Sequence, residues 1–137
     1  MTNRGYILFL DDDEARNPET TIQSPAREIV DGLRRKYPQA DLVWVKTSQD
    51  FIDSRTLELP IAVSLDHDIG ELGPEKETTG LLCAKSLCEI CYIAKVPLPE
   101  FYCHSNNPPG KDNILGEFNF YTKHHPWMVP QEKIISQ

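Results

Sequence analysis

Residues 6–13 read YILFLDDD, an apolar run of five followed directly by three aspartates. A continuous apolar run of this length is typical of a parallel strand buried on both faces, and the change to aspartate indicates where the strand reaches solvent. The pattern returns in residues 61–68, IAVSLDHD, and in a shorter form in residues 100–107, EFYCHSNN. The sequence thus predicts three strands that each end in polar residues, and the first two of them are expected to be buried.

Helical patterns lie between these strands. Apolar residues recur at helical spacing in residues 29–37, 80–94 and 114–121, and a short helix containing Phe51, Ile52 and Leu57 is expected. Residues 41–47 are rich in β-branched and aromatic residues and predict one more strand. Alternation of strands and helices implies right-handed crossovers, so we expect an α/β three-layer sandwich with a mainly parallel sheet of about four strands.

The composition fits one domain, since the chain has 137 residues, of which 39% are hydrophobic and 26% charged. We expect that domain over residues 1–125 and a C-terminal tail over residues 126–137, where proline interrupts any fifth strand. No apolar run approaches the length that crosses a bilayer, and residues 1–5 do not read as a signal sequence, so we expect a cytoplasmic protein. The formal net charge of −7 argues against an extended surface for duplex nucleic acid.

Four cysteines raise the question of a zinc site. Cys83, Cys88 and Cys91 fall on the apolar stripe of a predicted helix, and Cys103 ends a predicted strand. Thiols in such positions are typical of a reduced core, so we expect buried cysteines in preference to a metal cluster.

The polar segments after the three strands form the candidate functional site, because ligand sites of α/β proteins gather at the carboxyl ends of parallel strands. Gathered carboxylates repel one another, and a hard divalent cation such as Mg²⁺ or Mn²⁺ would relieve the repulsion through oxygen ligands. A helix cap or a turn explains any single one of these residues, but three clusters in one sheet favour a functional site. The clusters are Asp11-Asp12-Asp13, Asp66-His67-Asp68 and His104-Ser105-Asn106-Asn107.

Two further signals point to phosphate chemistry. Histidine side chains titrate near neutral pH, and His67 and His104 are both expected at this rim. One can act as a base and the other as an acid, or either can bind metal or orient a carboxylate. Asn107 and Lys111 flank a proline-rich helix start, where N–H groups and a lysine can hold an anion. An ordinary helix cap with a solvent-facing lysine is the alternative for this pair.

Together these motifs resemble one known family. LDD at residues 10–12 with Arg16 downstream, SLDHDIG at residues 64–70, and HSNNPPG at residues 104–110 with Asn113 are similar to the cyclic-phosphate processing receiver domains. The second and third motifs are the most specific. The resemblance implies a relative of the response-regulator receiver, with a flavodoxin-like fold, whose acidic pocket acts on cyclic phosphates of nucleotides or RNA ends.

The resemblance covers residues 6–121 and also implies roles for single residues. In the family pattern Asp11 and Asp12 correspond to the metal-binding acidic pair, Asp66 to the phosphate-accepting aspartate and Ser105 to the phosphate-sensing hydroxyl. The additions of this branch are His67, Asp68 and His104. An ordinary receiver ends its fifth strand in a phosphate-contacting lysine, which this sequence does not show, and that weakens the case for simple phosphorelay signalling.

The leading expectation is metal-dependent phosphoester processing, with Mg²⁺ or Mn²⁺ as cofactor and a cyclic phosphate of a nucleotide or an RNA end as substrate. A phospho-accepting receiver module and a noncatalytic nucleotide- or phosphate-binding interaction protein stay open as alternatives, and a protein partner is compatible with each. The candidate residues are Asp66, His67 and His104 for catalysis, Ser105, Asn107 and Lys111 for phosphate, and Asp11, Asp12, Asp66 and Asp68 for metal.

Overall fold

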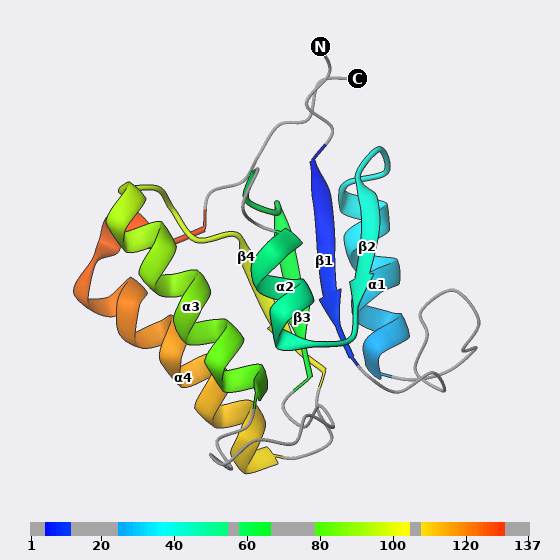
Figure 1. Cartoon of the computed structure of the whole chain (residues 1–137). Coiled ribbons are helices and arrows are strands. Elements are labelled where there is room, and N and C mark those ends of the chain that lie inside the picture. Colours follow the sequence, from blue (N-terminus) through cyan, green and yellow to red (C-terminus); the bar gives the residue numbers. More distant parts are fainter. Residues whose placement is uncertain (1–4, 12–24, 55–57, 67–78, 105–107, 131–137) are drawn as a thin grey trace.

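Four parallel strands form a sheet at the centre of the molecule (Figure 1). The computed structural model describes residues 5–11, 25–54, 58–66, 79–104 and 108–130, and the sheet lies within them. The strand order is β2-β1-β3-β4, and every pairing is parallel. The strands are β1 (Tyr6–Leu10), β2 (Asp41–Val45), β3 (Ala62–Leu65) and β4 (Glu100–Cys103).

The register of the sheet aligns the carboxyl ends of the strands. Leu10 lies opposite both Val45 and Leu65, and Leu65 lies opposite Cys103. Every residue of β1 and β3 is buried, as expected of central strands that are covered on both faces. The residues that follow the strands therefore emerge at one common edge, which we call the strand-end rim.

Helices cover both faces of the sheet. Helix α1 lies on one face, and α2, α3 and α4 lie on the other (Figure 1). The bounds are α1 (Pro25–Lys36), α2 (Ser48–Ser54), α3 (Thr79–Ala94) and α4 (Pro108–His124), and a short 3₁₀ helix, η2 (Pro126–Met128), follows α4. The predicted order of strands and helices is confirmed, and so is the three-layer α/β fold with a four-stranded parallel sheet.

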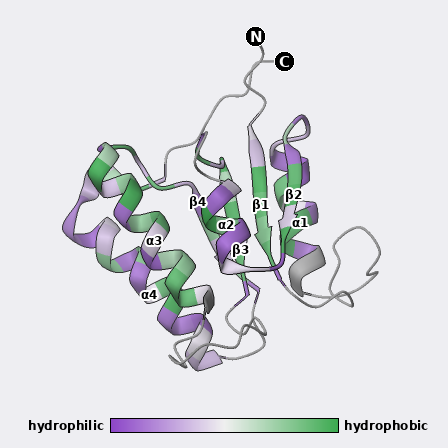
Figure 2. Cartoon of the chain, viewed as in Figure 1, coloured by the Kyte–Doolittle hydropathy of each residue, from purple (hydrophilic) through white to green (hydrophobic). Residues whose placement is uncertain are grey.

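The strand side chains alternate between two apolar layers. Leu8, Leu10 and Leu65 pack in the larger cluster with residues of α2, α3 and α4, whereas Ile7 and Phe9 pack on the α1 side. Figure 2 shows hydrophobic residues concentrated in the strands, with helices of mixed character around them. Burial of one such side chain contributes about 1.5–3 kcal/mol, so the two layers around the sheet dominate the stability of the fold.

All four cysteines are buried thiols. Cys83, Cys88 and Cys91 lie on the buried side of α3, and Cys103 ends β4. Burial, with a smaller contribution from the nearby Glu117, raises the pKa of the Cys88 thiol. The predicted core position of the cysteines is confirmed.

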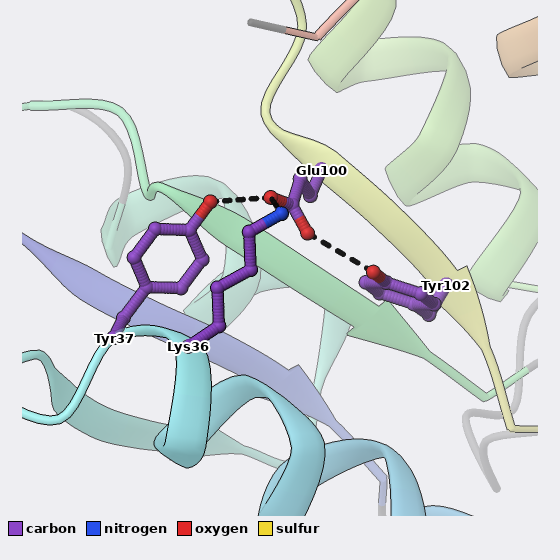
Figure 3. Close-up of polar contacts among 4 residues, drawn as sticks. All are labelled: Lys36, Tyr37, Glu100 and Tyr102. Carbon is purple, nitrogen blue, oxygen red and sulfur yellow. Dashed lines mark hydrogen bonds and ion pairs between the residues drawn. The ribbon is translucent and has the colours of Figure 1, made fainter. Parts of the chain in front are cut away.

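A polar cluster joins α1 to the amino end of β4 (Figure 3). The Glu100 carboxylate accepts hydrogen bonds from Lys36 and Tyr37 at the end of α1, and from Tyr102 at 3.0 Å. Burial alone would raise the pKa of Glu100, but these hydrogen bonds outweigh burial and lower that pKa. Burial and the hydrogen bond to Glu100 raise the pKa of Tyr37 to about 12. We call these four residues the Glu100 cluster.

The short helix predicted to contain Phe51 and Ile52 is confirmed. It is α2, Ser48–Ser54, and the Thr47 hydroxyl caps its start by accepting a hydrogen bond from the Asp50 N–H at 3.0 Å. Leu57, which the prediction placed in the same helix, lies outside the described residues. Beyond α4, Met128 is buried, and its carbonyl accepts a hydrogen bond from the Leu98 N–H at 2.9 Å. The described part of the chain contains no fifth strand and no helix that is long and apolar enough to cross a membrane.

Candidate functional site

The strand-end rim brings three of the predicted site residues together. The backbone ladder of the sheet continues past the strands, because the N–H groups of Asp11, Asp66 and His104 donate to carbonyl groups of the neighbouring strands at 3.1, 3.0 and 3.1 Å. These hydrogen bonds fix the main chain of all three residues at the carboxyl edge of the sheet. The predicted convergence of the strand ends is therefore confirmed for the described residues.

The residues at this rim are buried although they are polar. Within the described residues, the polar or charged side chains that are buried belong to Asp11, Ser64, Asp66 and His104, with exposed fractions of 0, 0, 1 and 3%. We call these four residues the strand-end cluster. A buried polar group costs free energy unless it is hydrogen-bonded, and a buried charge costs more unless it is compensated.

His104 joins two members of the cluster through its two ring nitrogens. Its Nε2 lies 3.0 Å from Asp11 Oδ2, and its Nδ1 lies 2.7 Å from Ser64 Oγ. An ionised carboxylate can only accept, so Nε2 carries a hydrogen and donates to Asp11. In a neutral ring Nδ1 then accepts from the Ser64 hydroxyl, and in a charged ring it donates to that hydroxyl. The ring also stacks on Phe9, with centroids 4.5 Å apart and planes inclined by 12°.

Ser64 entered the sequence reasoning only as the first residue of the SLDHDIG motif and was given no role there. It stands within the apolar run of β3, opposite Phe9 of β1. The available signal was its hydroxyl, because a polar group in a strand buried on both faces must find a hydrogen-bond partner. Since Ser64 is fully buried in a central strand, its hydroxyl has no access to a substrate and is not a nucleophile.

A second contact that the sequence reasoning missed lies at the end of β2. The indole N–H of Trp44 donates to the Asp11 carbonyl at 2.8 Å, and the Lys46 ammonium lies 4.7 Å from the centre of the Trp44 ring system. The face of an indole attracts a cation in this position. The pair places a positive charge on the β2 side of the rim.

The structure describes four of the predicted site residues, namely Asp11, Asp66, His104 and Lys111. Lys111 is exposed in the first turn of α4, which begins at Pro108 as the proline-rich helix start predicts. The predicted site residues outside the described part of the chain are Asp12, Asp13, His67, Asp68, Ser105 and Asn107. The roles assigned to all of these residues stay predictions.

Two of the predicted metal ligands lie among the described residues. Asp11 and Asp66 offer carboxylate oxygens, which hard cations such as Mg²⁺ and Mn²⁺ prefer, and two buried carboxylates at neighbouring strand ends gain from a positive charge between them. Across the described ranges, no group of three or more His, Cys, Asp or Glu side chains can hold a metal ion. The other two predicted ligands, Asp12 and Asp68, lie outside the described residues, and metal binding stays a prediction.

Comparison with protein families identifies the segment that carries the site. Residues 6–119 match the family model described as the cyclic-phosphate processing Receiver domain. The matched segment runs from the first residue of β1 into α4 and includes the whole strand-end cluster. A comparison with curated proteins found no match.

Proposed function

The chain belongs to the cyclic-phosphate processing receiver domain family, and we propose that it is a metal-dependent enzyme acting on cyclic phosphates of nucleotides or RNA ends. The observation that carries the proposal is the strand-end cluster, in which two carboxylates are buried at neighbouring strand ends and His104 is bonded to one of them. Buried carboxylates in a fold without an evident packing need for them are typical of functional sites.

The proposed cation ligands are Asp11 and Asp66, together with Asp12 and Asp68. Repulsion between carboxylates is strong where the protein excludes water, so this edge is costly to keep negatively charged. A bound divalent ion would offset that charge and draw electron density from the phosphate oxygens. The carboxylates supply the oxygen donors, and the strand ends hold them in place through the backbone hydrogen bonds of Asp11 and Asp66.

Hydrolysis of a cyclic phosphate adds one water molecule across a P–O bond. The water oxygen bonds to phosphorus, one ring P–O bond breaks, the water loses a proton, and a proton reaches the departing oxygen. His67 and His104 are the two candidates for these proton transfers. Ser105, Asn107 and Lys111 are the candidates for holding the phosphate by hydrogen bonds and positive charge.

The test is turnover of cyclic mononucleotides, and of RNA with a 2′,3′-cyclic phosphate end, with Mg²⁺ or Mn²⁺ and after chelation. We expect turnover that requires the cation and that falls by at least about 10²-fold in the double variant Asp66→Asn, His104→Ala. Asp41→Asn is the matched control, because Asp41 is an exposed aspartate at the opposite edge of the sheet, and it should keep full turnover. Equal turnover by the double variant and the wild type would refute the proposal.

A phospho-accepting receiver is the second candidate function, favoured by the match to a receiver domain and by the place of Asp66 directly after β3. In that reaction an Asp66 oxygen bonds to the phosphorus of a donor such as acetyl phosphate, and acetate leaves. Intact-mass measurement after incubation with acetyl phosphate separates the two functions. A stable adduct of one phosphoryl group that is lost in Asp66→Asn favours signalling, and turnover without an adduct favours the enzyme.

A further inference from the structure

The place of His104 suits the positioning of another side chain better than proton transfer to a substrate. Both ring nitrogens are in hydrogen bonds with buried groups, and only 3% of the residue is exposed. A general acid or base needs a nitrogen within hydrogen-bond reach of the reacting oxygen, directly or through one water. For Nε2 to reach a substrate it would have to leave Asp11, and the ring would have to slide from its stack on Phe9.

Ser64 completes this arrangement from inside the sheet. Its hydroxyl lies 2.7 Å from Nδ1, a nitrogen that would otherwise be an unsatisfied buried polar atom at a cost of about 1–3 kcal/mol. A ring turned by half a rotation would present carbon atoms to both Ser64 and Asp11 and lose both hydrogen bonds. The Ser64 hydroxyl and the Asp11 carboxylate therefore select a single orientation of the His104 imidazole.

We propose that His104 is a positioning residue: Ser64 fixes the imidazole, and the imidazole fixes the Asp11 carboxylate at the rim through its Nε2–H. This inference rests on the proposed function, since it concerns a carboxylate that we propose to bind the cation. Groups that hydrogen-bond a ligating side chain typically change metal affinity by about 10–100-fold when they are removed. Proton transfer to the substrate then falls to His67 among the two histidine candidates.

Glutamine at this position separates positioning from proton transfer. The side-chain amide of His104→Gln keeps an N–H that can donate to Asp11 but has no group that exchanges a proton near neutral pH. We expect this variant to keep Mn²⁺ affinity and turnover within about tenfold of the wild type, with an unchanged pH profile, whereas His104→Ala loses Mn²⁺ affinity by about 10–100-fold. Normal Mn²⁺ binding by His104→Gln with turnover lost by about 10²–10⁴-fold would show that His104 transfers the proton, and the inference would be wrong.

Ring-nitrogen NMR of protein labelled with ¹⁵N-histidine tests the same inference without turnover. We expect the Nε2–H of His104 to be protected from solvent exchange, and Ser64→Ala to speed that exchange and weaken Mn²⁺ binding by about tenfold or more. Ser86→Ala, on α3, is the matched control and should change neither. A His104 Nε2–H that exchanges as fast as the ring N–H groups of His124 and His125 would overturn the inference. Protection and Ser64-dependent Mn²⁺ binding without turnover would leave it standing while the proposed function fails.

Discussion

Two polar clusters lie on the α1 side of the sheet and hold their carboxylates in different ways. In the Glu100 cluster one carboxylate receives three donors, and one of them is the Lys36 ammonium (Figure 3). The side chains of Lys36 and Glu100 are 42 and 13% exposed, so water screens part of the remaining charge. The Lys36 ammonium compensates the negative charge of Glu100, and the cluster connects α1 to the edge strand β4.

The strand-end cluster differs in burial and in its sum of charges. Asp11 and Asp66 are 0 and 1% exposed, and His104 adds at most one positive charge to them. With both carboxylates ionised, the four members of the cluster sum to at least one negative charge, and a charge at these buried positions costs free energy unless other groups compensate it. Burial and the donors that the carboxylates receive are therefore what separates the strand-end cluster, which we propose to be functional, from the Glu100 cluster.

Replacing one carboxylate by its amide in the strand-end cluster should produce the largest effect. We expect Asp66→Asn to lower turnover by at least about 10²-fold, because a ligand of the proposed cation is lost. The free energy of unfolding without cation should stay the same or rise, because a buried charge and its repulsion are removed. Mn²⁺ should raise the melting temperature of the wild type and not that of the variant. Thermal denaturation with and without Mn²⁺ measures this, and a metal-free variant destabilised by more than about 2 kcal/mol would mean that Asp66 is structural.

The corresponding change of a carboxylate to its amide in the Glu100 cluster should lower the free energy of unfolding and leave turnover nearly unchanged. Glu100→Gln keeps the shape but weakens three charge-assisted hydrogen bonds, so we expect a loss of about 1–2 kcal/mol in the free energy of unfolding and turnover within about twofold of the wild type. Urea denaturation measures the first and the cyclic-phosphate assay the second. Loss of turnover with unchanged stability would connect this cluster to the reaction and remove the contrast between the two clusters.

Alkaline pH should act on the Glu100 cluster through Tyr37. Its pKa is raised from 10 to about 12, so between these values the unfolded chain has lost the phenolic proton and the folded chain has kept it. The stabilising effect is therefore complete below pH 10 and is lost as the pH rises toward 12. We expect Tyr37→Phe to make the free energy of unfolding fall less steeply over this range, as measured by urea denaturation at several pH values. Parallel curves for both proteins would contradict the assignment.

The strand-end residues were predictable because a parallel sheet turns distant positions into neighbours. Buried strands are recognised in the sequence as apolar runs, and the change from apolar to acidic residues indicates where the strands at residues 6–10 and 61–65 end. The parallel topology then brings Asp11, Asp66 and His104 to one edge of the sheet. The alternation of strands and helices along the chain was enough to predict that these three residues lie at one edge.

The contacts inside each cluster were not predictable from the sequence. The hydrogen bond between Ser64 and His104 depends on the register of β1, β3 and β4 and on the rotation of one imidazole ring. In the Glu100 cluster, Lys36 and Tyr37 are separated from Glu100 by 64 and 63 positions in the sequence. Neither α1 nor β4 carries a local signal for that pairing. Sequence patterns indicate which side chains share an edge, whereas packing determines which of them are bonded.

The smallest effect is expected at Trp44, which donates a hydrogen bond to the main chain of Asp11. Trp44→Phe removes the indole hydrogen bond to the Asp11 carbonyl and should lower the free energy of unfolding by about 0.5–1.5 kcal/mol. The Asp11 main chain is also held by its own N–H bond to the Val45 carbonyl at 3.1 Å, so its side chain should keep its place. Mn²⁺ affinity should therefore change by less than about threefold, far less than in His104→Ala. Trp127→Phe, at an exposed position on η2, is the control for loss of an indole. A tenfold loss of Mn²⁺ affinity in Trp44→Phe alone would mean that the main chain of Asp11, as well as its carboxylate, is positioned from outside the strand-end cluster.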